Sequence, residues 1–219
     1  MNSTVSRRAR RATTRHRRRP FPIWLVAAVV IVILGAVVAI GAMSDGDVDA
    51  GRQFGTVEVT GEPLPGFGTA PDPAVGAQAP QIAGVDFDGR ASAIGGTGRP
   101  TLVVFLAHWC PHCNREAPRL AAYLDRDGVP TDVDIVLVPT GSNELREHWP
   151  PSEWIADQRL DRLPVVLDTA DGEIASAFGL GGYPFIVLLD AAGTVIERRS
   201  GEQPEGAFAE MVASLRTAP

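Results

Sequence analysis

Residues 101–118 read TLVVFLAHWCPHCNREAP and contain Cys110 and Cys113, the only two cysteines in the 219-residue chain. An apolar run typical of a buried strand leads directly into the cysteines, and Cys110 falls where a helix would begin, with Pro111 at its first position. The free backbone N–H groups and the dipole of a helix N-terminus favour a thiolate at Cys110. We therefore expect a reactive cysteine here, because the thiolate is the nucleophile.

The spacing of the cysteines also favours redox chemistry. Two residues separate them, so on the first helical turn their sulfurs can join as a disulfide or part as two thiols. One alternative is a static disulfide, but closing so short a loop removes little chain entropy. Another is a zinc site completed by His108, His112 or His148, but the chain has no second Cys-x-x-Cys pair to supply further sulfur ligands.

Charge is divided unevenly along the chain. Of the 20 basic residues, all arginine, eight lie before residue 20, whereas all 26 acidic residues follow residue 44. The part from residue 44 onward has 12 arginines against 26 acidic residues, a formal charge of −14. An acidic domain of this kind argues against nucleic-acid binding.

Residues 23–43 are 21 residues without a charge. As a helix they would span about 31 Å, close to the hydrocarbon thickness of a bilayer. We therefore predict an uncleaved transmembrane signal-anchor, with the arginine-rich tail 1–22 in the cytoplasm and the cysteines outside. The alternative is a cleaved signal peptide, although its apolar core is usually about 7 to 15 residues. Either way, the cysteines are expected where disulfides persist.

The remainder divides into two parts by composition. Residues 44–75 are rich in Gly, Pro and Asp and predict an extracytoplasmic linker with only a short strand-like piece at 56–59, and residues 76–219 have the length of one domain. Strands alternate with helices and a hairpin and helix close the chain, which predicts an α/β domain with a mixed sheet and helices on both faces. The expected strands are 82–87, 91–94, 102–107, 133–139, 165–167, 185–190 and 194–199, and the expected helices are 110–126, 152–159, 173–178 and 204–215.

This order of elements, with Trp-Cys-x-x-Cys after a buried strand and Tyr183-Pro184 before a later one, resembles the thioredoxin superfamily. The membrane-anchored TlpA/ResA-like thiol-disulfide oxidoreductases match best, through VGAQAP at 75–80, DFDG at 86–89 and WCPHCNREAP at 109–118. The resemblance implies a thioredoxin-like fold with an N-terminal hairpin extension. The Pro-His dipeptide between the cysteines is instead the one found in strongly oxidising DsbA-like proteins.

The resemblance also implies a role for several residues. Cys110 would be the nucleophile that forms a mixed disulfide with a substrate protein, and Cys113 the resolving thiol. Pro184 would be a cis-proline that faces the disulfide and presents the backbone of Tyr183 to a substrate strand. Trp109 would shield the site or simply pack against the core.

Two further residues have two interpretations each. Glu116 matches the acidic residue of the TlpA/ResA-like motif and would relay a proton to or from the thiols; the alternative is an exposed glutamate that complements the helix dipole. His112 would add a cation beside Cys110 and favour its thiolate; the alternative is a solvated histidine without a role. The segment 148–154, HWPPSEW, forms either a partner-binding edge or a cap on the core.

The sequence thus predicts a membrane-anchored, extracytoplasmic thiol-disulfide oxidoreductase that needs no cofactor or metal. Its expected partners are exported thiol or disulfide proteins, the lipid bilayer through residues 23–43, and a membrane electron-transfer or quinone-linked redox partner. The direction of exchange stays open. His112, and Val104 in place of the strand aspartate of cytosolic thioredoxins, favour an oxidant, whereas the family likeness and the anchor favour a reductant.

Two other functions are less consistent with the residues. A non-enzymatic module would bind extended peptides in a groove at Tyr183 and Pro184. A thiol peroxidase would need a threonine or serine three residues before its reactive cysteine and a proline four residues earlier still. Those places hold Ala107 and Val103.

Overall fold

The structure, a computed structural model, describes residues 52–68 and 70–218. The predicted cytoplasmic tail, 1–22, and the predicted transmembrane helix, 23–43, lie outside these residues. Within the part of the chain that is described, no helix combines the length and the apolar character needed to cross a membrane.

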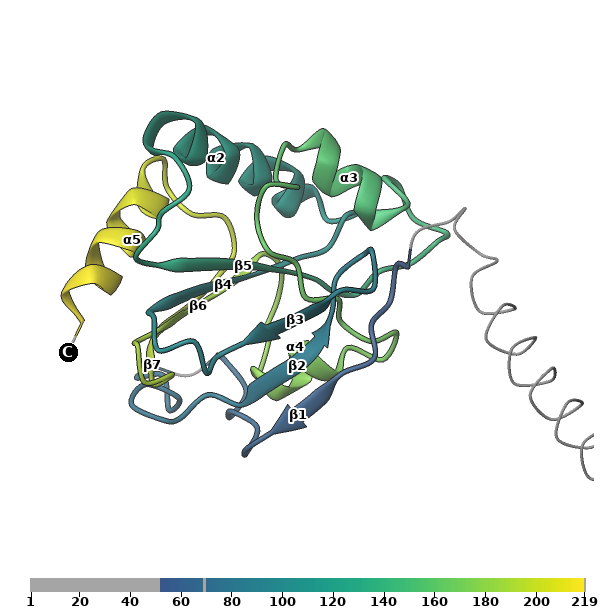
Figure 1. The fold of residues 1–219 in the computed structure, drawn as a ribbon. Coiled ribbons are helices and arrows are strands. Elements are labelled where there is room, and N and C mark those ends of the chain that lie inside the picture. The colour runs from purple at the N-terminus through teal and green to yellow at the C-terminus, as the bar shows by residue number, and fades with distance from the viewer. Residues whose placement is uncertain (1–51, 69, 219) are drawn as a thin grey trace, which may run out of the picture. The chain divides into compact units, whose positions relative to one another are not determined.

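A four-stranded mixed sheet with the order β5-β4-β6-β7 forms the centre (Figure 1). β4 (Thr101–Leu106) pairs in parallel with β5 (Asp134–Pro139) and antiparallel with β6 (Phe185–Leu189). β7 (Val195–Ser200) pairs antiparallel with β6 at the edge. β4 and β6 are buried at every position, which explains their continuous apolar sequence.

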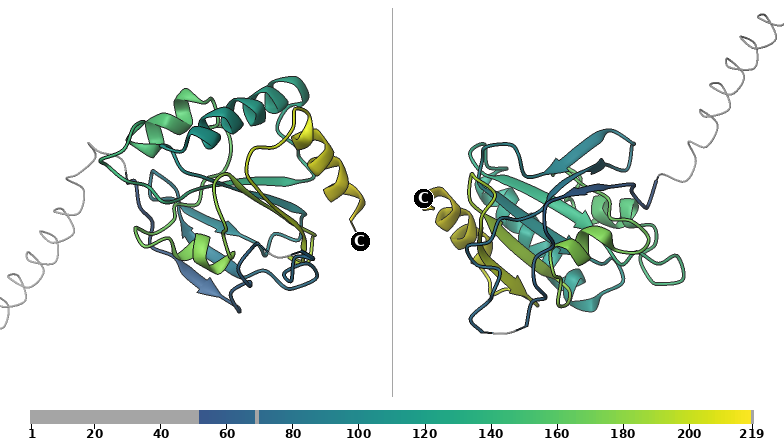
Figure 2. Two further views of the ribbon diagram at one scale, coloured as in Figure 1. Left: turned by 180° about the vertical axis from the view of Figure 1, so that it is seen from behind. Right: turned by 90° about the horizontal axis from the view of Figure 1, so that it is seen from below.

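Both faces of this sheet are covered. α2 (Pro111–Asp127), α3 (Pro151–Asp157) and α5 (Ala207–Thr217) pack on one face, and α4 (Glu173–Ala177) packs on the other (Figures 1 and 2). Side chains alternate along β4 accordingly, with the even-numbered residues facing α2 and the odd-numbered ones facing α4. The predicted α/β thioredoxin-like architecture is confirmed.

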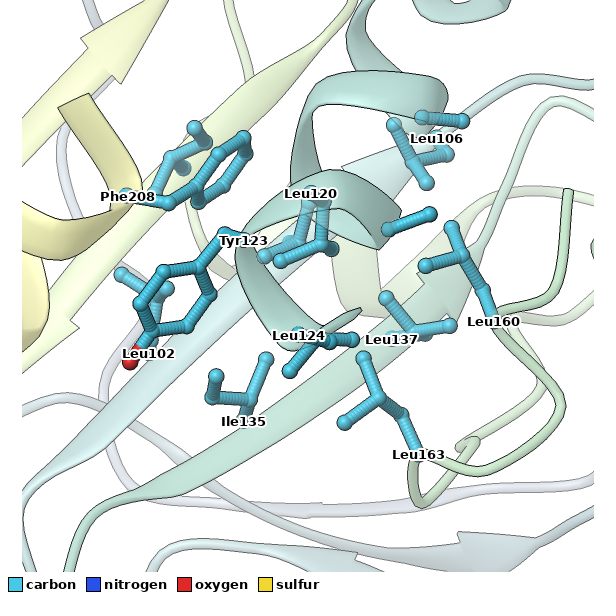
Figure 3. Close-up of a cluster of buried hydrophobic side chains, with 14 of the residues drawn as sticks. Leu102, Leu106, Leu120, Tyr123, Leu124, Ile135, Leu137, Leu160, Leu163 and Phe208 are labelled. Atoms are coloured by element: carbon cyan, nitrogen blue, oxygen red, sulfur yellow. The ribbon is translucent and has the colours of Figure 1, made fainter. Parts of the chain in front are cut away.

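The helix that carries the cysteines is anchored by its own apolar face. In Figure 3, Leu120 and Leu124 of α2 lie among side chains from β4, β5 and the segment after α3, with Phe208 of α5 beside them. Leu120 is fully buried. Truncating such a leucine to alanine typically costs about 2–5 kcal/mol, so this contact holds α2 in place against the sheet.

A second, three-stranded antiparallel sheet packs on the α4 side. It consists of β1 (Glu58–Thr60), β2 (Gln81–Val85) and β3 (Ala91–Ile94) in that order. The turn between β2 and β3 is the predicted Asp-Gly hairpin: Asp86 Oδ1 accepts the N–H groups of Asp88 and Arg90. The N-terminal hairpin extension is therefore present.

The structure differs from the predicted linker, residues 44–75, at several places within the part that it describes. β1 overlaps the strand-like piece expected at 56–59, but it pairs into the second sheet, and Leu64 is buried in the apolar cluster on the α4 face. The fully buried Arg198 guanidinium donates to the Asp72 carboxylate and to the carbonyl of Pro65 at 2.8 Å. A Gly- and Pro-rich segment can pack through carbonyls and single side chains without regular structure, so its composition does not distinguish a linker from a packed part of the domain.

One expected strand is also wrong. Residues 165–167 make only a single parallel bridge, between Leu137 and Val165, rather than a strand. The other expected strands and helices are present, most of them with ends shifted by one or two residues. The largest shift at a helix start is in the last helix, which is expected from residue 204 and begins at Ala207.

Candidate active site

Cys110 lies at the N-cap of α2, directly after β4, as the sequence predicts. Its backbone is extended, with φ −76° and ψ 122°, and Pro111 takes the first helical position. No side chain caps the helix, so the N-terminal N–H groups remain directed at this end. Both cysteines are free thiols, and Cys110 keeps 6% of its surface exposed whereas Cys113 has none. Of the two cysteines, only Cys110 has exposed surface from which its sulfur can attack another molecule.

Cys113 faces the interior. Its Sγ accepts the N–H of Ala107 at 3.4 Å. Burial nevertheless raises the pKa of the Cys113 thiol far above its usual range, and the charges on Cys110 and Glu116 add to this. Cys113 is therefore held as a thiol until a base takes its proton, which fits a resolving cysteine rather than the nucleophile.

The loop before β6 meets the cysteine pair. The Tyr183–Pro184 peptide bond is cis, as predicted, and the Tyr183 carbonyl oxygen lies 3.9 Å from Cys110 Sγ. The Tyr183 ring packs edge-on against Trp109, with 5.9 Å between ring centroids. Trp109 in turn donates its Nε1–H to the Gly141 carbonyl at 2.7 Å. These contacts fix the backbone and aromatic groups on one side of the reactive sulfur.

Glu116 is fully buried, so the interpretation as an exposed glutamate is wrong. Its Oε2 accepts the Gln203 N–H at 3.0 Å and a guanidinium N–H of Arg119 at 3.2 Å. Its Oε1 is also buried, and no group in residues 52–68 and 70–218 hydrogen-bonds to it. Burial raises the pKa of Glu116 above its ordinary value. The position six residues before Cys110 holds the apolar, buried Val104, so the helix rather than the strand supplies an acid near the thiols.

His112 is exposed but has partners. Its Nδ1 lies 2.6 Å from Glu202 Oε1 and 2.9 Å from Arg115 Nη2. Arg115 also pairs with Glu202. The Arg115 guanidinium, followed by His112, holds the pKa of Glu202 at about 2, well below its usual range. His112 thus belongs to a charged cluster at the mouth of the site, and Glu202 is a member that local sequence reasoning misses because it lies 90 residues further along the chain.

His108, the other histidine near the cysteines, has a structural role. It is almost fully buried, its Nδ1 lies 2.7 Å from the Glu147 carbonyl, and its Nε2 accepts the Asn143 N–H at 3.2 Å. Since Nε2 accepts, the ring is neutral with its proton on Nδ1, and burial lowers the pKa of His108 accordingly. His108 therefore holds the loop after β5 beside Trp109.

The segment 148–154 mainly closes the core. Trp154 is buried, and its Nε1 donates to Asn114 Oδ1 at 2.8 Å. Asn114 Nδ2 donates to the carbonyls of His108 and Cys110. Across the described ranges, no group of three or more His, Cys, Asp and Glu side chains is placed to hold a metal ion.

Two thiols at the end of one strand, of which only Cys110 keeps any exposed surface, can accept a disulfide from another molecule one sulfur at a time. This is the chemistry of the thiol-disulfide oxidoreductases of the thioredoxin superfamily, and the chain is an enzyme of that class. More narrowly, residues 74–216 match the Redoxin family model, and the chain belongs to the Redoxin family.

Named relatives agree with this assignment. The methylamine utilization protein MauD of Paracoccus versutus is 29% identical over 145 residues, covering 66% of this chain and 68% of that protein. A thiol:disulfide interchange protein TxlA homolog of Synechocystis is 30% identical over 118 residues, covering 54% of this chain and 50% of that protein.

Solved structures share the fold. A thiol:disulfide interchange protein DsbE from Chlorobium tepidum superimposes with a TM-score of 0.53 at 20% identity, covering 64% of this chain and 96% of that one. The thioredoxin domain of a thiol-disulfide oxidoreductase from Bacteroides vulgatus gives a TM-score of 0.51 at 24% identity, covering 64% and 96%.

Proposed function

We propose that the chain is a membrane-anchored, extracytoplasmic reductant of disulfides in exported proteins. The observation that carries this proposal is the contrast between Cys110, which reaches the surface beside the Tyr183 carbonyl, and Cys113, which is buried near the acid Glu116. A nucleophile that keeps a small exposed surface, backed by a fully buried resolving thiol, suits an enzyme that takes up a disulfide from a protein substrate.

The reaction has two exchange steps. The Cys110 thiolate attacks one sulfur of a substrate disulfide, a mixed disulfide forms, and the other substrate sulfur leaves as a thiolate that takes a proton from solvent. Cys113 then loses its proton and attacks Cys110 Sγ, which releases the second substrate thiolate and leaves a Cys110–Cys113 disulfide. Two electrons and two protons reach the substrate.

Glu116 is the group that takes the Cys113 proton in the second step. Burial raises the pKa of both groups, so a proton moves between them without creating a pair of buried charges. The Oε1 atom is free of other protein partners in the described structure and is available to carry this proton.

Two features of the site favour reduction of substrate disulfides over oxidation of substrate thiols. The sequence leaves the direction open, and two of its features favour an oxidant: His112 would add a cation, and Val104 replaces a strand aspartate. In the structure, Glu202 pairs with His112, which offsets that charge, and Glu116 supplies a buried acid from the helix. Turnover then needs a second dithiol protein, which we assign to a membrane electron-transfer partner that reduces the Cys110–Cys113 disulfide.

The proposed location rests on the uncharged residues 23–43 and the eight arginines before residue 20. An impermeant maleimide applied to intact, reduced cells tests it. The proposal predicts that the full chain stays in the membrane fraction and is labelled at Cys110 before lysis. Labelling only after lysis would place the domain in the cytoplasm and refute the proposed location.

A further inference from the structure

The loop between β7 and α5 brings one carboxylate to three basic side chains of α2. Glu202 Oε1 lies 2.6 Å from His112 Nδ1 and accepts Arg115 Nε–H at 2.8 Å. Glu202 Oε2 accepts from Arg119 Nη1 at 3.4 Å. The Glu202 side chain is only 23% exposed, whereas those of His112 and Arg115 are more than half exposed. The carboxylate therefore fixes the position of side chains that would otherwise move freely in solvent.

The same loop also contacts the surroundings of the buried thiol. The backbone N–H of Gln203 donates to Glu116 Oε2 at 3.0 Å. Arg119 Nη1 donates to the Gln203 carbonyl at 3.0 Å and to Glu116 Oε2 at 3.2 Å. The Glu202 side chain thus contacts basic groups near Cys110, and the backbone of the next residue, Gln203, contacts the acid near Cys113.

We propose that Glu202 is a positioning residue for the redox pair: it holds Arg115 and His112 at the mouth of the site and offsets their positive charge, which makes the pair a stronger reductant. This inference rests on the proposed function of the pair in disulfide exchange. Stabilising a reactive thiolate makes the corresponding disulfide more oxidising, so a carboxylate that offsets nearby cations acts in the opposite direction.

The charges around Glu202 and Arg115 support this direction of the effect on the reduction potential. The pKa of Arg115 is raised chiefly by Glu202 and, to a smaller extent, by the charge of Cys110, so the guanidinium is within electrostatic reach of the reactive sulfur. With its pKa held at about 2, Glu202 is ionised throughout the pH range in which thiols exchange. The other charged or titratable groups near this cluster are Arg119 and Glu116 of α2, which interact with Glu202. Tyr183, on the loop before β6, lies near Cys110.

The geometry around His112 adds a second role for the carboxylate. Arg115 Nη2 only donates hydrogen bonds, so neutral His112 can accept from it at Nδ1 over 2.9 Å. A protonated His112 cannot accept there and instead donates from Nδ1 to Glu202. Glu202 thus gives the imidazolium form a hydrogen-bond partner, whereas Arg115 serves the neutral form.

The test uses the full chain with Cys113→Ser, in which Cys110 is the only cysteine. The rate of alkylation of Cys110 by iodoacetamide is followed against pH. Glu202→Gln should move the midpoint of the profile to lower pH and raise the rate below the midpoint about threefold, the factor for about half a pH unit. In the two-cysteine chain, the same substitution should make the disulfide easier for glutathione to reduce, by a similar factor.

Three matched variants exclude a merely structural effect. Glu202→Asp keeps the charge and should retain most of the wild-type midpoint. Glu205→Gln removes an exposed carboxylate three residues further along and should leave the midpoint unchanged. In an Arg115→Gln background, the effect of Glu202→Gln should shrink, because the two residues act through one contact.

An unchanged midpoint, a shift to higher pH, or equal shifts in Glu202→Gln and Glu205→Gln would overturn the inference. The proposed function is checked separately by adding oxidised glutathione to the wild-type chain. A wild type that forms no mixed disulfide refutes the exchange chemistry and this inference with it. A reactive wild type combined with an unmoved Glu202→Gln midpoint refutes only the role of Glu202.

Discussion

The outer and inner sides of the cysteine pair lie within one helical turn, yet they are governed by different forces. On the outer side, the polar side chains of His112, Arg115 and Glu202 contact one another and reach solvent. On the inner side, Cys113 and Glu116 have no exposed surface. Water screens charges on the outer side, whereas on the inner side the cost of removing charges from water decides the protonation state.

This contrast means that the two sides contribute to different properties. Substitutions on the inner side should change whether the reaction completes and how stability depends on pH. Substitutions on the outer side should change the potential by small increments, because exposed ion pairs contribute little energy.

The largest expected effect separates the two thiols. Cys113→Ser should accumulate a mixed disulfide at Cys110 when the full chain meets a disulfide substrate, because nothing resolves it. Cys110→Ser should form no mixed disulfide, since the remaining thiol is buried and protonated. Mass spectrometry after acid quenching measures both. Trapping through Cys113 in the Cys110→Ser chain would reverse the assigned roles.

The next largest effect concerns the proton acceptor. Glu116→Gln keeps the shape and can still accept from Gln203 and Arg119, but it cannot take the Cys113 proton. The mixed disulfide should therefore resolve about a hundredfold more slowly, a typical contribution of a general base. Stopped-flow release of the second substrate thiol measures this step. Resolution at the wild-type rate would mean that solvent removes the proton.

The inner side should also give a distinctive pH dependence of stability. Burial raises the pKa of Glu116, so its protonated form stabilises the folded chain fully below the usual value of 4.5, and this stabilisation is lost as the pH rises through the folded-state pKa. Glu116→Gln should lack this loss. Denaturant unfolding of both chains at about pH 4 and about pH 8 compares them, and equal differences at the two pH values would contradict the prediction.

His108 should show the opposite sign. Burial lowers the pKa of His108, so neutral His108 contributes stability above the usual value of 6.5, which is lost as the pH falls through the lowered folded-state pKa. A His108→Gln chain should lose less stability on acidification than the wild type does. Chemical unfolding across this pH range measures the difference, and parallel curves for the two chains would show that His108 does not titrate on unfolding.

The smallest effect is expected on the outer side. His112→Ala removes one of the basic side chains paired with Glu202 and should make the disulfide somewhat harder to reduce. The change should be less than about tenfold in the equilibrium constant with glutathione, because the ring is exposed and its charge is shared. A larger change would show that His112 acts on Cys110 without being offset by Glu202.

The sequence predicts the parts of the site that depend on neighbouring residues. The strand before Cys110, the helix start at Pro111 and the cis bond at Pro184 follow from local patterns and from the family resemblance, and the structure contains all three. Glu116 is a candidate from its motif, but its burial depends on the later Gln203 loop and cannot be read from the helix alone.

The parts that the sequence does not predict depend on contacts between distant residues. Glu202 reaches His112 across 90 positions, and Arg198 reaches Asp72 across 126. Neither contact leaves a periodic or local signal, because an ion pair is set by where the sheet and loops meet. This also explains why the composition of residues 52–75 indicates a linker although much of that segment packs on the domain.

The reduction potential of the full chain tests the proposed role as a reductant most directly. Equilibration with glutathione buffers, followed by quantification of the Cys110–Cys113 disulfide, gives the value. Because Glu202 offsets the charge of His112 and Arg115, the potential should be about −200 mV or lower, nearer to thioredoxin than to DsbA. A value near about −120 mV would contradict the proposal and identify the chain as an oxidant.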